Sequence, residues 1–397
     1  MSDERERLHL AVLSEISELG PVRTKLLLER FGSAEKIFNA DREELRGIKG
    51  IGSRIAERIK DSKDMDQVRK RFNTHFARGT RCVFLTDESY PDNLFEIYDP
   101  PPVMFFKGSL PKKGEPLIAV VGSRSPSEYG KNIAYKLAFK LAEKGVGIVS
   151  GMAAGIDAFA HKGTLDAGGR TYAVLGSGVD VPYSPVNIDL YNRIMKQGGV
   201  ISEVRPSEPL LSGNFPSRNR IISGMADALI VVEARKRSGS LITADQAMEQ
   251  GKDIFAIPGR MTDLLSEDCN GLIKEGAYLL AGIRDILDIR ALNKKIITFN
   301  KIMKNTPETR ERADLRPASG ADKNVYMKTN VESDTKNDLA TTNYLLYSCL
   351  NLEPMSLNSI VEKSGLSPSE VAVGLIRLQI EEKVREITPN MFVRIDI

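Results

Sequence analysis

The chain has 397 residues, of which 41% are hydrophobic and 27% are charged, a balance typical of a globular protein with two or three domains. Its formal net charge is only +3, which excludes a strongly basic surface over the whole chain. Any nucleic-acid site must therefore be a local patch.

The cysteines and the N-terminus bear on the cellular compartment. Cys82, Cys269 and Cys349 lie far apart and form no CxxC pair, which disfavours a disulfide framework and a zinc ribbon. The first residues are charged, and no apolar run approaches the roughly 18 residues that a membrane span needs. We therefore expect a cytoplasmic protein with no membrane segment.

Residues 1–78 are expected to form an all-helical domain, because apolar residues such as Leu10 and Leu13 recur at helical spacing. Between residues 47 and 59, glycines separate two short apolar helices, the pattern of a helix-hairpin-helix. Such a hairpin can present backbone amides to a DNA phosphate, a contact that reads no base. Acidic neighbours such as Asp41 dilute the positive field, so DNA contact and a purely structural role both remain open.

Residues 79–290 predict an α/β domain. Two short strands, Cys82–Leu85 and Val103–Phe106, precede a region in which apolar runs alternate with helical patterns. The runs are apolar throughout, as in strands buried on both faces, and their alternation with helices predicts a doubly wound parallel sheet. The runs are Ile118–Val121, Val146–Val149, Thr171–Leu175, Gly199–Ile201, Ala228–Val232 and Asp253–Ile257.

Residues 291–340 are rich in lysine, asparagine, threonine and glutamate and predict a flexible linker. Residues 341–397 resume a compact pattern, typical of a small winged helix. Its third helix has few basic residues for a groove reader, which favours protein interaction over DNA reading. The expected helices and strands are Asn343–Leu350, Leu357–Lys363, Pro368–Glu382, Val384–Ile387 and Met391–Ile395.

Glycine-containing turns follow the first strands of the parallel sheet. Gly122, Ser123 and Arg124 follow the first, and Ser150 and Gly151 follow the second. Glycine lets a backbone approach an anion closely, and arginine matches a phosphate with two parallel hydrogen bonds. Because ligands of open parallel sheets bind outside the carboxyl ends of the strands, these turns predict a phosphate site.

A second segment predicts the other half of that site. Phe215 precedes Arg218, Asn219 and Arg220, just before an apolar helical run. The arginines, with Arg124, are expected to hold phosphates, assisted by the backbone amides of Gly122, Ser123 and Gly151, while the ring of Phe215 stacks on a base. Neither a GxGxxG nor a GxxxxGK[ST] pattern is present, so we expect no dinucleotide or P-loop cofactor.

No catalytic set emerges from the sequence. Asp157 and His161 lie four residues apart but lack a third ligand for a metal, so we expect them to cap and satisfy a packed helix. Glu203 and Glu233 end strands and could act as acid–base groups or bind an arginine of the site. We therefore assign no catalytic and no metal-binding residue.

The central domain resembles the DNA-processing protein A family, also called DprA or Smf, between about residues 90 and 281. The flanking segments fit the longer members, which have a helix-hairpin-helix (SAM-like) domain, a Rossmann-like domain and a terminal winged helix. The motifs that carry the resemblance are Val121–Arg124, Ser150–Gly151, Gly155–Asp157, Ala160–His161, Ala173–Gly176, Phe215–Gly224, Val232–Ala234, Ser238–Leu241 and Pro258–Gly259.

The resemblance implies a non-enzymatic role. Family members bind single-stranded DNA, form homodimers through the Rossmann-like domain and help load RecA recombinase during natural transformation and recombination. The turn from Gly122 to Arg124 and the segment from Phe215 to Arg220 belong to the family's DNA pocket. The implied DNA-binding residues are Gly122, Ser123, Arg124, Ser150, Gly151, Phe215, Arg218, Asn219 and Arg220.

Three positions depart from the family pattern. Asp268 stands where glycine is usual, a serine interrupts the tyrosine–proline pair within residues 183–187, and Asn390 replaces a common glycine in the wing. A carboxylate of Asp268 that pointed into the pocket would weaken a phosphate contact. Asparagine tolerates the same turn as glycine.

Two rival hypotheses remain. The same pocket could serve a nucleotide or phosphoribosyl hydrolase, with Glu233 or Glu203 as the acid–base group, because the fold alone does not fix the function. The chain could also be mainly an adaptor whose terminal domains dock partners.

Overall fold

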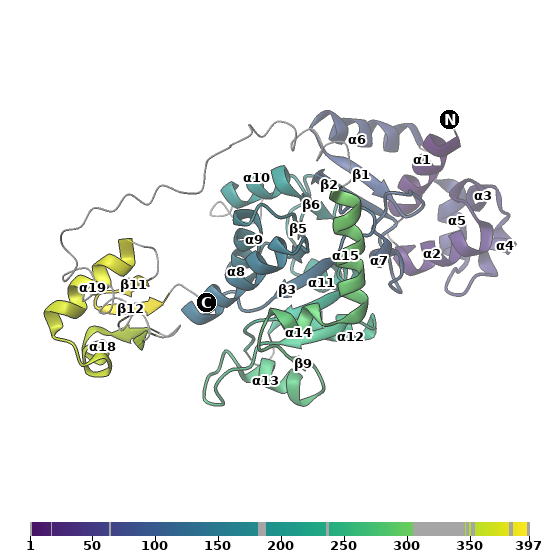
Figure 1. Cartoon of the computed structure of the whole chain (residues 1–397). Coiled ribbons are helices and arrows are strands. Elements are labelled where there is room, and N and C mark those ends of the chain that lie inside the picture. The colour runs from purple at the N-terminus through teal and green to yellow at the C-terminus, as the bar shows by residue number, and fades with distance from the viewer. Residues whose placement is uncertain are drawn as a thin grey trace. The chain divides into compact units, whose positions relative to one another are not determined.

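The computed structural model describes residues 2–16, 18–62, 65–181, 188–235, 238–304, 346, 349–350, 354–380 and 384–394. The chain divides into two compact units, Met1–Pro126 with Ile133–Ile302, and Ser127–Asn132 with Met303–Ile397 (Figure 1). Within the described ranges, no helix is both long enough and apolar enough to cross a membrane.

The N-terminal part is all helical, as predicted. Leu10, Leu13 and Leu19 are fully buried and join a core that extends to Phe84 and Phe105 of the neighbouring sheet. The hairpin between α4 and α5 turns at Gly50, whose φ of +84° favours glycine. The helices are α1 (Ser2–Ser14), α2 (Gly20–Phe31), α3 (Ala34–Asn39), α4 (Arg42–Arg46), α5 (Ser53–Asp61) and α6 (Met65–Ala77).

A nine-stranded sheet forms the centre of this unit, in the order β1-β2-β6-β5-β4-β3-β7-β8-β9. Strand β2 pairs antiparallel with both β1 and β6, and the other neighbouring strands pair parallel, so the predicted doubly wound sheet is confirmed. The strands are β1 (Arg81–Phe84), β2 (Val103–Gly108), β3 (Leu117–Val121), β4 (Gly147–Ser150), β5 (Thr171–Val174), β6 (Gly199–Ser202), β7 (Ala228–Val231), β8 (Asp253–Ala256) and β9 (Tyr278–Leu279).

Helices cover both faces of the sheet. Side chains of α9 and α10 pack on one face, and side chains of α11, α12 and α13 pack on the other. The order of the strands reverses at β3, which lies between β4 and β7, and ligands of such sheets bind at this reversal. The helices are α7 (Asp92–Phe95), α8 (Glu128–Glu143), α9 (Ile156–Asp166), α10 (Ile188–Gln197), α11 (Asn214–Met225), α12 (Gly239–Glu249), α13 (Glu267–Lys274) and α14 (Ile283–Leu287).

The predicted linker begins too early. Residues 291–304 belong to a helix, α15 (Arg290–Lys304), and not to a flexible segment. Its buried residues Leu292, Ile296 and Phe299 follow helical spacing within a lysine-rich stretch, and Lys295 pairs with Asp227 at 2.7 Å. The rest of the predicted linker, 305–340, lies outside the described residues.

The second unit contains the expected helix pair and hairpin, plus a short strand that we did not predict. Its sheet has the order β10-β12-β11, and Ile360, Leu375 and Phe392 contribute to its core. Asn390 turns the hairpin with a φ of +63°. Most of the predicted helix Asn343–Leu350 lies outside the described residues. The elements are β10 (Met355–Ser356), α18 (Leu357–Ser364), α19 (Pro368–Ile380), β11 (Val384–Thr388) and β12 (Met391–Arg394).

Candidate nucleic-acid interface

A cavity of about 590 Å³ opens where the strand order reverses between β3 and β7. Its walls come from the turn after β3, the start of α11, and the segment that joins β7 to α12. Of the predicted site residues, six line it: Gly122, Ser123, Arg124, Phe215, Arg218 and Asn219.

The turn after β3 is held by its own backbone. A Cβ at Gly122 would lie 2.9 Å from the carbonyl oxygen of Glu233, so only glycine fits there. The amide of Ser123 donates to that carbonyl oxygen at 2.6 Å. The amide of Gly151 likewise donates to the Asp157 carboxylate at 3.1 Å. Both amides therefore donate within the protein, and the predicted phosphate contacts of Ser123 and Gly151 would have to replace these hydrogen bonds.

Arg124 and Phe215 form the mouth of the cavity. The Arg124 guanidinium lies over the Phe215 ring, with its carbon 4.7 Å from the ring centroid. Arg124 is exposed, and Phe215 is half-buried in the first turn of α11. This cation–π contact places a phosphate-binding group and a stacking surface side by side.

Arg218 lines the cavity from below, and its buried side chain also has a structural role. Its side chain is 7% exposed, and Nη1 donates to the carbonyl oxygens of Gly151 at 2.8 Å and Val174 at 2.9 Å. Those two residues follow β4 and end β5. Arg218 therefore ties two strand ends to α11, and a Cβ at Gly151 would lie only 1.8 Å from Nη1.

Asp157 and His161 satisfy buried groups, as the sequence suggested. The Asp157 carboxylate accepts from the amides of Gly151 and Ala153, and burial raises its pKa while neighbouring Arg218 opposes that shift. His161 Nδ1 lies 2.6 Å from the Thr171 hydroxyl, and burial lowers its pKa to about 3. The imidazole is thus neutral at physiological pH.

Arg220 and Ser150 do not line the cavity, contrary to the sequence-based expectation. Arg220 is 7% exposed, and it donates to Glu203 at 2.5 Å and pairs with the Asp99 carboxylate at 3.2 Å. The Ser150 hydroxyl donates to the Val120 carbonyl oxygen at 2.6 Å. Both side chains are engaged by neighbouring elements and serve the scaffold.

The cavity also contains groups that the sequence did not single out. Arg235 is an exposed cation just after β7, and Ser212 and Thr243 add hydroxyls. None of them belongs to a recognisable pattern, so only the folded arrangement brings them together. Asp268 does not line the cavity; its amide donates to the Ala234 carbonyl oxygen at 3.2 Å. The unusual segment 183–187 falls outside the described residues.

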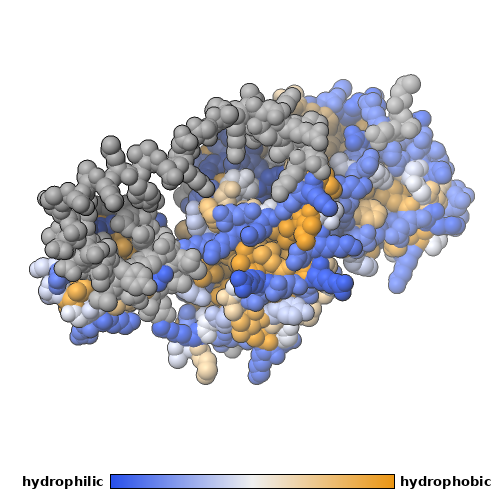
Figure 2. All heavy atoms as spheres, in the orientation of Figure 1, coloured by the Kyte–Doolittle hydropathy of each residue, from blue (hydrophilic) through white to orange (hydrophobic). Residues whose placement is uncertain are grey.

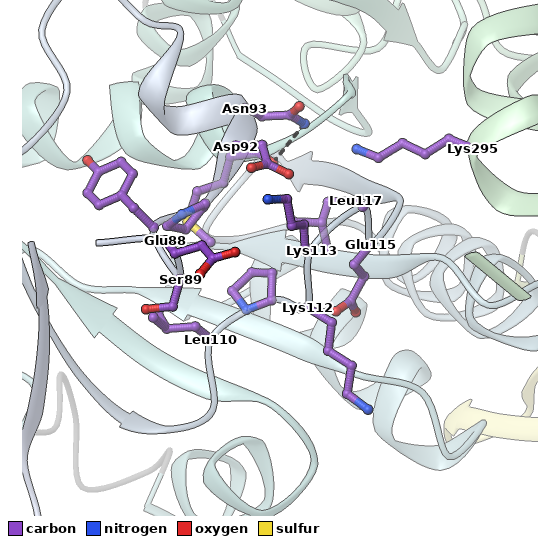
Figure 3. Close-up of a pocket in the computed structure, with 15 residues that line it drawn as sticks. Glu88, Ser89, Asp92, Asn93, Leu110, Lys112, Lys113, Glu115, Leu117 and Lys295 are labelled. Atoms are coloured by element: carbon purple, nitrogen blue, oxygen red, sulfur yellow. Dashed lines mark hydrogen bonds between the residues drawn. The ribbon is translucent and has the colours of Figure 1, made fainter. Parts of the chain in front are cut away.

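A second cavity, of about 520 Å³, lies near the start of β3 (Figure 3). Figure 3 shows its lysines Lys112, Lys113 and Lys295 interspersed with the carboxylates of Asp92 and Glu115. Charges of both signs alternate around it. It therefore lacks the concentrated positive charge that would favour an anionic ligand.

The helix-hairpin-helix carries compensated charge. Glu18 pairs with Arg54 at 2.9 Å and with Arg58 at 3.1 Å, so the cations of α5 face a carboxylate of the same domain. A phosphate would have to compete with Glu18 for both arginines. This arrangement favours the structural role over DNA contact.

Arg218 and Arg124 should differ sharply in their effect on stability. Arg218→Ala would leave two buried carbonyl oxygens without their donor and Asp157 without its cation, which should lower the free energy of unfolding by roughly 3 kcal/mol. Arg124→Ala, at the exposed rim, should change it by less than about 1 kcal/mol. Urea denaturation followed by circular dichroism measures both, and equal losses would contradict the assigned roles.

Comparison with known proteins places the chain in a family. Residues 81–290 match the model of DNA recombination-mediator protein A, and residues 10–62 match a SAM-like helix-hairpin-helix tandem. The chain is 32% identical to Protein Smf of Synechocystis over 94% of this chain and 95% of that protein. It is 47% identical to DNA processing protein DprA of Streptococcus pneumoniae over 51% of this chain and 72% of that one.

The crystal structure of DprA from Streptococcus pneumoniae shares the fold. It has a TM-score of 0.62 and 36% sequence identity, and covers 72% of this chain and 97% of its own. The match spans most of the described residues, and the predicted resemblance is confirmed. The chain belongs to the DNA recombination-mediator protein A family.

Proposed function

We propose that the chain binds single-stranded DNA in the cavity at the β3–β7 reversal and helps load RecA recombinase onto it. The role belongs to DNA uptake in natural transformation and to recombination, in the cytoplasm where the DNA lies, and needs no chemical step by this chain. The observation that carries the proposal is the contact between exposed Arg124 and half-buried Phe215 at the mouth of the cavity.

The chemistry of this pair favours a single strand over a duplex. A base can stack on a side-chain ring only when it has left its own stack, and such stacking contributes about 1–3 kcal/mol per base. The Phe215 ring is now covered by the Arg124 guanidinium. An incoming base takes the place of that guanidinium, which becomes available to a phosphate. Arg235 supplies a further exposed cation at the same cavity.

The rival hydrolase has less support. Neither Glu203 nor Glu233 lines the cavity, and Glu203 is engaged by Arg220 at 2.5 Å. Asp157 is the carboxylate among the described lining residues, and it is occupied by two backbone amides. These contacts suit a binding site and not an acid–base pair. Release of free base from a nucleoside monophosphate would revive the hydrolase.

We also propose that the chain forms a homodimer through its Rossmann-like domain. Strand β9 ends the sheet, and apolar side chains around it are exposed, among them Met261 (98%), Leu264 and Tyr278. Figure 2 shows apolar surface over the region of β9, α13 and α14. Exposed apolar patches of this kind mark protein interfaces.

Arg124→Ala should weaken binding of a labelled oligothymidylate about tenfold or more, because it removes the guanidinium that would meet a phosphate. The affinity of the parent chain should also fall as salt rises, and this slope should be shallower in the variant. Fluorescence anisotropy at several salt concentrations measures both. Lys196→Ala, which removes one exposed positive charge in α10 outside the cavity, is the control. An Arg124→Ala protein that binds as tightly as the parent at moderate salt would refute the site.

Base stacking can be observed directly because the chain has no tryptophan. Phe215→Trp introduces a single indole at the mouth of the cavity, and oligothymidylate should quench its fluorescence by stacking on it. Phe95→Trp, at an exposed position of α7 that does not line the cavity, should show no such change. Equal responses of the two tryptophans would exclude Phe215 as the stacking surface.

RecA loading is tested on single-stranded DNA coated with single-strand-binding protein. The parent chain should shorten the lag before RecA filaments form, and Arg124→Ala should lose most of this effect because it cannot hold the strand. The measurement is ATP hydrolysis by RecA over time. If Arg124→Ala stimulates RecA as well as the parent does, DNA binding at the cavity is not the basis of loading, and the adaptor hypothesis gains.

A further inference from the structure

A separate pocket of about 360 Å³ lies beside the edge strand β1, outside the proposed DNA cavity. This volume is at the lower end of the roughly 300–1,000 Å³ typical of ligand pockets. Helices α1 and α6 form its walls together with β1 and β2. We call it the edge pocket; its lining residues are Glu4, Arg7, Leu8, Ala11, Arg69, Phe72, Asn73, Phe76, Arg81, Cys82, Phe84 and Phe106.

The interior of the edge pocket is apolar and aromatic. Phe72 lies 6.1 Å from Phe76 and 6.2 Å from Phe84, measured between ring centroids, and Phe76 is 43% exposed. Burial raises the pKa of Cys82 to about 12, so its thiol stays protonated and contributes only an apolar wall. An apolar and aromatic interior of this kind favours one or two apolar side chains of a ligand.

The rim of the edge pocket is cationic. Three arginines, Arg7, Arg69 and Arg81, line it, against the single lining carboxylate of Glu4. Arg7 pairs with Asp87 at 2.9 Å. Among the described residues, no carboxylate forms an ion pair with Arg69 or Arg81, although Arg81 lies over the Phe106 ring at 4.7 Å and donates to the Gly108 carbonyl oxygen.

We propose that the edge pocket binds a partner protein through a short acidic peptide segment that carries an apolar or aromatic side chain. The side chain enters the space between Phe72 and Phe76, and the flanking carboxylates meet Arg69 and Arg81. The charge at the rim supplies complementarity, and the apolar interior supplies affinity.

The lining chemistry favours a peptide over a nucleic acid. A base that entered this pocket would bury ring nitrogens and oxygens against phenylalanines, and unpartnered polar groups are costly to bury. Asn73 is the neutral amide among the lining residues, so a buried base would find few hydrogen-bond partners there. An apolar side chain has no such requirement.

A fluorescein-labelled peptide of three aspartates followed by leucine and phenylalanine is a direct probe. The full chain should bind it, and raising the salt concentration should weaken binding. The double variant Arg69→Glu, Arg81→Glu should bind about tenfold more weakly or worse. Phe76→Ser should also weaken binding while leaving the charges intact, and a peptide with serines in place of leucine and phenylalanine should bind poorly.

The controls separate this pocket from general charge and from the DNA site. The variant Arg42→Glu, Lys49→Glu reverses two exposed charges of the same domain outside the pocket and should bind the peptide normally. The Arg69→Glu, Arg81→Glu protein should still bind oligothymidylate at the Arg124 site. Absence of peptide binding, an equal loss in the control variant, or displacement of the peptide by oligothymidylate from the Arg124→Ala protein would each overturn the proposal.

Discussion

The position of helix α11 depends on two of its buried arginines, Arg218 and Arg220, whose side chains bind different neighbouring elements. Arg218 donates to the carbonyl oxygens at the ends of β4 and β5, and Arg220 is held on another side by Glu203 and Asp99. Burying an arginine is costly unless its donors find partners, and here Nη1 of Arg218 and both Nη atoms of Arg220 find them. The two arginines fix the rotation of α11 and its position along its own axis. Phe215, one turn earlier, is thereby held at the mouth of the cavity.

This anchoring explains why glycine is needed at Gly151. The Arg218 guanidinium occupies the space that a Cβ would take, 1.8 Å from Nη1. The Asp157 carboxylate lies below, accepting the amides of the same turn, so cation, carboxylate and turn form one buried polar network. Such networks are rigid when every member is satisfied. Arg124 lies outside this network, so it can exchange its contact with Phe215 for another without disturbing the buried residues.

The fold could be predicted from the sequence to a large extent, and the site only in part. The apolar runs at Ile118–Val121 and Ala228–Val232 predicted buried parallel strands. A strand that is buried on both faces shows no alternation of apolar and polar residues. Helix α15 was missed because three buried residues are spread among lysines. The motif around Arg218 predicted the right segment, but not that Arg218 and Arg220 are buried and donate to neighbouring oxygens, since a sequence shows a charge and not the direction in which it points. Arg235 was missed because its contact with the cavity depends on the β3–β7 reversal.

Buried residues hold the cavity in shape, whereas the residues at its mouth are more exposed. The residues that hold the cavity in shape, Arg218, Arg220 and Asp157, are buried, whereas Arg124 is exposed and Phe215 half-buried. A change at the mouth of the cavity is therefore expected to alter the proposed affinity for a DNA strand with little cost in folding free energy, while a change to the buried residues alters both. The same logic applies to the edge pocket, where exposed arginines surround a phenylalanine floor. Its lining shares no residue with that of the larger cavity, so the proposed protein partner and the proposed DNA strand do not compete for a side chain.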